Sequence, residues 1–201
     1  GPRLRDFGAP ALRAGLRLSL IPSHMPQITR VLPAVDATLA MAQAIATILR
    51  GGDCLTLTGE LGTGKTTFLR GLAGALKANT AMVSSPTFVL INQYPLAADT
   101  PALGAQELVH ADAYRLRGHD DLDALGWDRF VEQDPTATVR IRSSIVLAVE
   151  WPSRIQNLDA LPPAEHILTV ELEHGSSPDE RIMTLHVPTA WISRPGVQQL
   201  L

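Results

Sequence analysis

The sequence predicts an α/β fold in which helices flank a mixed, partly antiparallel central sheet. Two observations lead to this prediction. In the first half of the chain, strand-like and helix-like segments alternate, which is the order that builds parallel strands with helices on their faces. In the second half, the alternating segments His166–Glu173 and Arg181–Val187 stand on either side of a Gly-Ser-Ser-Pro turn, which indicates an antiparallel hairpin.

Length and composition limit the class of protein. The 201 residues suit one domain with a sizeable core, and a formal net charge of −3 gives no general attraction to nucleic acid. A single cysteine, Cys54, excludes an internal disulfide and fits a reducing compartment. No apolar run is long enough to span a bilayer. We therefore expect a cytoplasmic protein that does not contact a membrane.

The first residues differ from the rest of the chain. Gly1-Pro2 resembles the scar of a cleaved tag, and residues 3–24 contain several arginines and few acids but no continuous apolar stretch of the kind found in signal peptides. We expect residues 1–24 to be a peripheral N-terminal extension and residues 25–201 to form a single domain.

The early elements follow from their apolar spacing. Residues 27–32 predict a short strand that Pro33 ends. A helix follows, for which Asp36 is the expected N-cap and Gly51-Gly52 the expected C-terminal stop. Cys54–Thr58 alternates as a strand, and Thr67–Leu76 has helical spacing.

The run Gly59–Thr66 between that strand and that helix reads Gly-Glu-Leu-Gly-Thr-Gly-Lys-Thr, which fits the phosphate-binding P-loop pattern G-x-x-x-x-G-K-[ST]. Its glycines allow backbone N–H groups to surround phosphate oxygens. Lys65 is placed to reach the β- and γ-phosphates, the Thr66 hydroxyl to ligate Mg²⁺, and the following helix adds its positive dipole end. Strand, loop and helix in this order predict a P-loop NTPase fold.

The later elements complete the sheet. Residues 87–94 and 107–112 predict two strands, which we interpret as hairpin partners across a loop rich in Pro, Ala and Gly. Residues 120–131 are predicted to be mostly helical. Residues 144–150 form a strongly apolar stretch, which predicts a buried strand.

A second acidic group is expected on the metal side of such a site, at the end of a buried strand. Glu150 and Asp112 both satisfy this condition, and the pattern alone leaves both open. His110 shares a strand face with Asp112, where a histidine is more often a structural hydrogen-bond partner than a proton shuttle. The chain contains no Asn-Lys-x-Asp motif for guanine, so ATP is the expected nucleotide.

The ordered motifs resemble one family. Leu57–Gly71, then Ser85-Pro86-Thr87-Phe88, then His110–Leu116 and finally Glu150-Trp151-Pro152 are similar to the bacterial tRNA threonylcarbamoyladenosine biosynthesis ATPases known as TsaE or YjeE. The likeness covers about residues 27–187.

The resemblance implies roles for individual residues. Asp112 is expected on the γ-phosphate side, Ser85-Pro86-Thr87 in a switch-like loop that contributes Thr87 to catalysis, and Lys65 as a catalytic cation. Thr66 and Glu150 are expected to hold Mg²⁺. The expected ATP-binding residues are Thr38, Gly59, Glu60, Leu61, Gly62, Thr63, Gly64, Lys65, Thr66 and Thr67.

The resemblance also implies partners. It predicts a small ATPase, weak alone, that drives cycling of TsaD-type and TsaB-type proteins and meets tRNA only through that complex. A nucleotide-gated assembly module and a small-molecule kinase remain alternatives, because fold does not fix function. Arg115 and Arg117 offer cations for a kinase, but nothing in the sequence marks an acceptor site.

Overall fold

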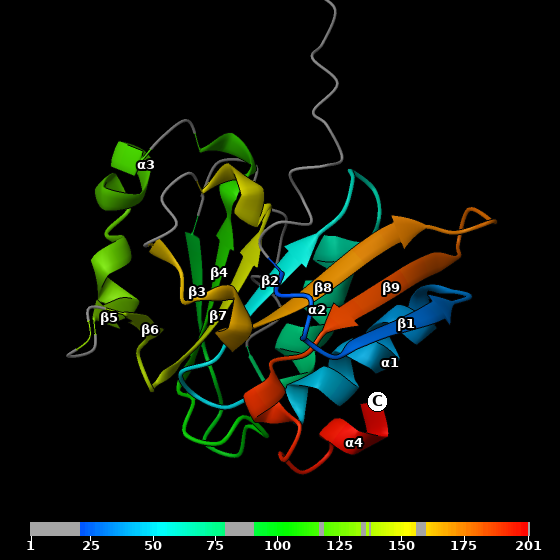
Figure 1. The fold of residues 1–201 in the computed structure, drawn as a ribbon, viewed down its shortest axis with the longest axis horizontal. Coiled ribbons are helices and arrows are strands. Elements are labelled where there is room, and N and C mark those ends of the chain that lie inside the picture. The colour runs from blue at the N-terminus through cyan, green and yellow to red at the C-terminus, as the bar shows by residue number, and fades with distance from the viewer. Residues whose placement is uncertain are drawn as a thin grey trace, which may run out of the picture.

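The computed structural model describes residues 21–78, 91–116, 119–133, 136, 138–155 and 160–200 (Figure 1). The predicted strands 87–94, 107–112 and 144–150 correspond to β3, β4 and β7, although residues 87–90 lie outside the described part. The strands are β1 (Gln27–Leu32), β2 (Cys54–Thr58), β3 (Ile91–Pro95), β4 (Glu107–Asp112), β5 (Val131–Gln133), β6 (Val139–Ile141), β7 (Ile145–Glu150), β8 (Ile167–His174) and β9 (Arg181–His186). The α-helices are α1 (Val35–Ala46), α2 (Lys65–Ala75), α3 (His119–Ala124) and α4 (Val197–Leu200).

Seven strands form one sheet in the order β1-β9-β8-β2-β7-β4-β3, and β5 pairs with β6 separately. The four central strands β8, β2, β7 and β4 are parallel to their neighbours within this group. The outer strands are antiparallel, since β3 pairs with β4 and β9 pairs with both β8 and β1. The predicted mixed sheet and both predicted hairpins are therefore confirmed.

The sheet separates two apolar cores because successive side chains of a strand point to opposite faces. In β7, Val146 and Ala148 pack in the core that contains α1 and α2, whereas Leu147 and Val149 pack in the core that contains Leu122 of α3. All six residues of β7 are buried. A strand covered on both faces is expected to be apolar along its length, and β7 is apolar from Ile145 to Val149.

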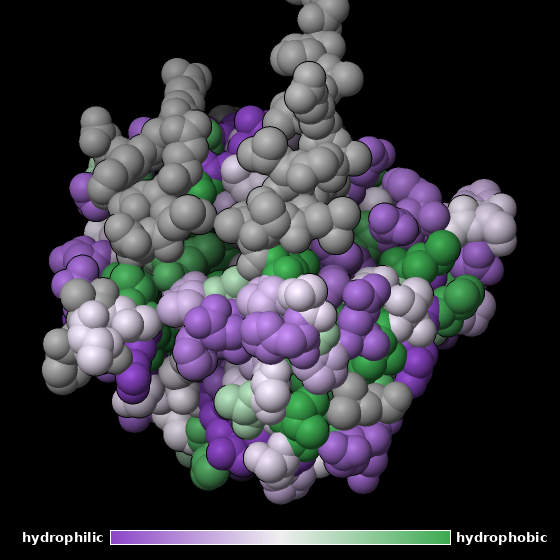
Figure 2. All heavy atoms as spheres, in the orientation of Figure 1, coloured by the Kyte–Doolittle hydropathy of each residue, from purple (hydrophilic) through white to green (hydrophobic). Residues whose placement is uncertain are grey.

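Helices α1 and α2 pack closely against each other on one face, as Figure 1 shows. A Cβ added at Gly71 of α2 would lie 2.9 Å from Leu39 Cδ2 and 3.1 Å from Ala42 Cβ. The absence of a side chain at Gly71 thus permits the approach that fixes where α2 lies, and α2 begins at the phosphate loop. On the face seen in Figure 2, hydrophilic and hydrophobic residues are interspersed.

The C-terminal segment joins the core, although the sequence pattern predicted only that it belongs to the domain. Trp191 and Val197 are buried, and α4 lies at the lower end of the view in Figure 1. Arg194 donates to both carboxylate oxygens of Asp53, at 2.6 and 2.9 Å, and to Ile48 O at 3.2 Å. This bidentate pair ties the chain end to the loop that enters β2.

Two helix predictions were wrong in detail. The N-cap of α1 is Ala34, with Asp36 in the first turn, and α1 ends at Ala46 instead of continuing to Gly51-Gly52. The lack of a side chain at Gly51 instead allows its backbone to lie close to that of Ser143, because a Cβ at Gly51 would lie 1.9 Å from Ser143 O.

The predicted helix over residues 120–131 is only partly present. Helix α3 ends at Ala124, Gly126 has φ +69°, and a 3₁₀ turn at Trp127–Arg129 leads into β5. A residue in the left-handed conformation, here Gly126, commonly ends a helix. The helical spacing of apolar residues therefore continues in the sequence beyond the point where α3 ends.

The predicted extension of residues 1–24 lies mostly outside the described residues, which begin at residue 21. Met25 is 6% exposed and packs at the start of the domain, and Val187 donates to Pro26 O. Across the described ranges, none of the helices has the length and apolar character needed to cross a bilayer. The proposed division at residue 25 stays a prediction.

Candidate functional site

Three neighbouring parallel strands end at the same edge of the sheet. Asp112 of β4 is paired with Glu150 of β7, and Glu150 with Leu57 of β2, directly before the phosphate loop. Paired residues on parallel strands point to the same face. Glu150 has the parity of Val146 and Ala148, so both acids lie on the face covered by α1 and α2. The site therefore forms where ligands bind in open α/β sheets.

The phosphate loop has the backbone that its glycines permit. Gly59, Gly62 and Gly64 have φ values of +137°, +77° and +99°. A Cβ at Gly59 would lie 2.2 Å from Leu172 O, whereas one at Gly64 would meet no atom within 4 Å. Gly64 is the N-cap of α2, which starts at Lys65. Open space beside a helix N-terminus fits the approach of an anion.

Lys65 is only 5% exposed and points back along the loop. Its ammonium donates to Gly59 O at 2.9 Å and to Glu60 O at 2.8 Å, and lies 4.1 Å from the centroid of the Trp151 ring. Burial lowers the pKa of Lys65, and the charges of Glu150 and Asp112 oppose this effect. The site thus holds a partly desolvated cation beside two carboxylates.

The two acids have different surroundings. Glu150 is 3% exposed, and its Oε1 lies 3.1 Å from Nε2 of the fully buried His110. Asp112 is half-buried and accepts a hydrogen bond from Tyr114 N at 3.0 Å. Burial raises the pKa of Asp112, against the lowering effect of that hydrogen bond. His110 therefore orients the deeper acid, and Asp112 is the more accessible one.

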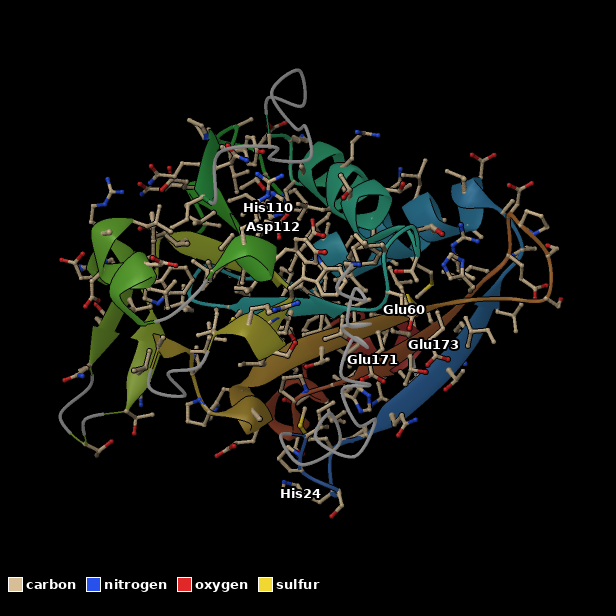
Figure 3. All side chains as sticks on the ribbon, turned by 90° about the horizontal axis from the view of Figure 1, so that it is seen from above. His24, Glu60, His110, Asp112, Glu171 and Glu173 are labelled. Atoms are coloured by element: carbon tan, nitrogen blue, oxygen red, sulfur yellow. The ribbon has the colours of Figure 1, made fainter. Side chains whose placement is uncertain are left out.

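A row of rings and cations leads from the site outward. Trp151 has a φ of +57°, and the centroid of its ring lies 5.0 Å from the centroid of the Tyr114 ring. The Arg154 guanidinium lies over the Tyr114 ring at 5.6 Å. In Figure 3 the His110 and Asp112 side chains lie close together, while Glu60 projects separately from the phosphate loop.

Several predicted residues occupy other positions or remain undescribed. Ser85-Pro86 and the proposed catalytic Thr87 lie outside the described residues. Thr38 is 3% exposed on α1, and within the described ranges no hydrogen bond connects its side chain with the phosphate loop. Arg115 is exposed in the 3₁₀ turn that follows Asp112.

A magnesium site at Thr66 and Glu150 is compatible with this donor set. A hydroxyl and a carboxylate are hard oxygen ligands, and Mg²⁺ is usually held by one or two carboxylates together with substrate phosphates and waters. Over the described part of the chain, no group of three or more His, Cys, Asp and Glu side chains forms a metal cage.

Two residues that contact the phosphate loop were missed in the sequence. Arg181 donates to Thr63 O at 3.1 Å and to Gly62 O at 3.3 Å, and His174 Nε2 donates to Leu61 O at 3.3 Å. Both come from the β8–β9 hairpin, over a hundred residues after the motif. No local pattern marks them, because only the pairing of β8 with β2 brings the hairpin here.

The chain matches the family described as "Threonylcarbamoyl adenosine biosynthesis protein TsaE" over residues 32–183. It belongs to the TsaE family. A relative from Bacillus subtilis, named tRNA threonylcarbamoyladenosine biosynthesis protein TsaE, is 40% identical over 74% of this chain and 78% of its own. The protein of the same name from Mycobacterium bovis is 34% identical over 78% and 84%.

A solved structure agrees with this assignment. The crystal structure of Bacillus subtilis YdiB is similar, with a TM-score of 0.55 and 27% identity, covering 83% of this chain and 88% of that one. The TsaE family resemblance and the P-loop fold that the sequence predicted are therefore confirmed.

The raised pKa of Asp112 predicts a pH-dependent stability. A carboxyl whose folded pKa lies above its ordinary value of 3.8 favours folding when protonated and loses that contribution as pH rises through the folded pKa. Asp112→Asn should therefore raise the melting temperature at pH 7, and the gain should vanish at acidic pH below 3.8. Melting curves across this range, with the exposed Asp128 changed to Asn as control, test it; a gain independent of pH would contradict it.

Proposed function

We propose that this TsaE family member is an ATP-binding, Mg²⁺-dependent ATPase that acts in the formation of threonylcarbamoyladenosine in tRNA. The observation that carries the proposal is the buried Lys65 ammonium, which lies within a glycine-rich loop and is electrostatically coupled to Glu150 and Asp112. Cation, N–H donors and carboxylates meet at one sheet edge, as phosphoryl transfer from a nucleotide requires. The names of the relatives supply the pathway.

The chain's groups have distinct roles in this proposal. Lys65 exchanges its two carbonyl contacts for oxygens of the β- and γ-phosphates, where negative charge develops. Thr66 and Glu150 hold Mg²⁺, which neutralises phosphate charge when bound. Asp112 accepts a hydrogen bond from the water that attacks the γ-phosphorus, while the bond to the β–γ bridging oxygen breaks and ADP leaves. His110 keeps the Glu150 carboxylate in place.

The partners in this proposal are TsaD-type and TsaB-type proteins, with tRNA reached through that complex. The sequence lacks a guanine-recognition motif, which favours ATP. Arg115 follows Asp112 by three residues and is the internal candidate for a transition-state arginine. A nucleotide-gated assembly module is the second candidate function. It is favoured by the same phosphate loop but requires binding alone, without turnover.

Lys65→Ala should lower ATP hydrolysis by roughly 10²-fold or more, because it removes a preorganised cation from the growing phosphate charge. Phosphate release at saturating ATP measures this loss. Lys77→Ala is the matched control, since Lys77 is an exposed lysine paired with Asp99. Turnover of the Lys65 variant near that of the wild type would remove the basis for the P-loop assignment.

Replacing the two acids should separate metal binding from turnover. Glu150→Gln removes a hard anionic oxygen and should chiefly weaken the Mg²⁺ dependence of nucleotide binding. Asp112→Asn should slow hydrolysis while ATP still binds. Nucleotide titrations with and without Mg²⁺, combined with hydrolysis rates, test the split, and identical behaviour of both variants would refute it.

Partner proteins should raise a weak intrinsic activity. A supplied arginine is worth roughly 10³–10⁵ in rate in P-loop enzymes. Phosphate release should therefore increase as TsaD-type and TsaB-type proteins are titrated in with tRNA. A flat response, with complex formation confirmed by gel filtration, would favour the nucleotide-gated module instead, and a phosphorylated small acceptor would favour a kinase.

A further inference from the structure

Every carbonyl oxygen from Gly59 to Thr63 accepts a hydrogen bond from a side chain. The Lys65 ammonium binds the first two, at 2.9 and 2.8 Å. His174 Nε2 donates to the third, at 3.3 Å. Arg181 donates to the fourth through its terminal nitrogen at 3.3 Å and to the fifth through Nε at 3.1 Å. The outer contacts, to the last three carbonyls, therefore all come from the β8–β9 hairpin.

Holding a carbonyl fixes the amide that follows it. In a trans peptide the C=O of one residue and the N–H of the next point in opposite directions. The contact of Arg181 with Thr63 O thus sets the direction of the Gly64 N–H, and that of His174 with Leu61 O sets the Gly62 N–H. Neither the Gly62 N–H nor the Gly64 N–H donates a hydrogen bond within the described part of the chain. Both amides remain available to an anion.

Arg181 is itself held in position. It is paired with His174 as the last residue pair of the hairpin, and its NH1 donates to Pro178 O and Glu180 O, each at 2.7 Å. The pairing of β8 with β2 stops at Glu171, so the end of β8 extends beyond β2 and runs beside the loop. The guanidinium fork therefore joins a rigid hairpin to a loop whose glycines leave it several backbone conformations.

We propose that Arg181 is a positioning residue for nucleotide binding, which holds the phosphate loop with its amides directed toward the phosphates, and that His174 assists it. This inference rests on the proposed binding of ATP. Arg181 acts through the loop backbone and not by contact with the reacting atoms. Its loss should weaken the binding of both ADP and ATP, because the amide cradle serves the phosphates common to them.

The test compares three variants by calorimetric titration of ADP and ATP with Mg²⁺. Arg181→Gln should raise both dissociation constants by roughly 10-fold or more, because it removes the guanidinium that donates to both Gly62 O and Thr63 O, and one charge-assisted hydrogen bond alone accounts for about a factor of ten. Arg181→Lys should show a smaller increase, because an ammonium retains the charge but not the fork. Arg129→Gln is the matched control, since Arg129 also donates to two carbonyls, those of Gly126 and Leu125.

A kinetic readout separates positioning from general stability. Arg181→Gln should raise KM for ATP while kcat changes by less than about twofold, the pattern for lost uniform binding. Its melting temperature without nucleotide should fall no further than that of Arg129→Gln. If Arg181→Gln does not fold, Arg181→Lys decides, and a wild-type KM in that variant overturns the proposal.

Different results would overturn the proposed function and the positioning role of Arg181. Wild-type protein that binds neither ADP nor ATP would overturn the proposed function. Wild-type protein that binds both, together with Arg181→Gln dissociation constants equal to wild type, would overturn the positioning role alone. Equal losses in Arg181→Gln and Arg129→Gln would also overturn it, because they would show a general effect of losing a surface arginine.

Discussion

The common end of β2, β7 and β4 is the constraint on which the rest of the structure depends. Because these strands are parallel and in register, the phosphate loop, Glu150 and Asp112 lie at the same edge of the sheet. The two acids also lie on the same face. The packing of α1 on α2, permitted by Gly71, then sets where Lys65 lies. A one-residue change in the register of β7 would turn Glu150 to the opposite face, away from α2. Because both faces of β7 are buried, its apolar pattern alone does not select this register.

Charge in this site is held by mutual compensation. A buried ammonium is unfavourable alone, and so is a buried carboxylate, but the positive charge of Lys65 and the negative charges of Glu150 and Asp112 offset part of each other's desolvation penalty, while the two carboxylates repel each other. The compensation is incomplete: burial still lowers the pKa of Lys65 and raises that of Asp112. Groups held away from their ordinary pKa values are typical of functional sites, where stability is lower than packing alone would allow.

The sequence was sufficient for elements whose signal is local. The G-x-x-x-x-G-K-T motif, the apolar run of β7 and the alternation of β8 and β9 each identified their element, and Glu150 and Asp112 were recognised as strand-end acids. It was insufficient where tertiary contacts decide. Asp36 is a good N-cap by type, yet the helix starts two residues earlier, with Ala34 as its N-cap. Arg194 and Arg181 look like ordinary surface arginines until the fold brings Asp53 to one and the phosphate loop to the other. Thr87, expected from family resemblance, stays a prediction.

In the proposed function, nucleotide and Mg²⁺ act on these same charged groups. Phosphate oxygens offer Lys65 stronger acceptors than the two loop carbonyls it now contacts, and a divalent cation beside Glu150 adds the positive charge that two carboxylates lack. In this proposal each ligand offsets part of the desolvation of Lys65 and the two carboxylates, and their effects reinforce each other. A ligand that binds only the folded state stabilises it in proportion to the logarithm of its concentration. Nucleotide binding as proposed would also stabilise β8 and β9, because Arg181 and His174 connect that hairpin to the phosphate loop.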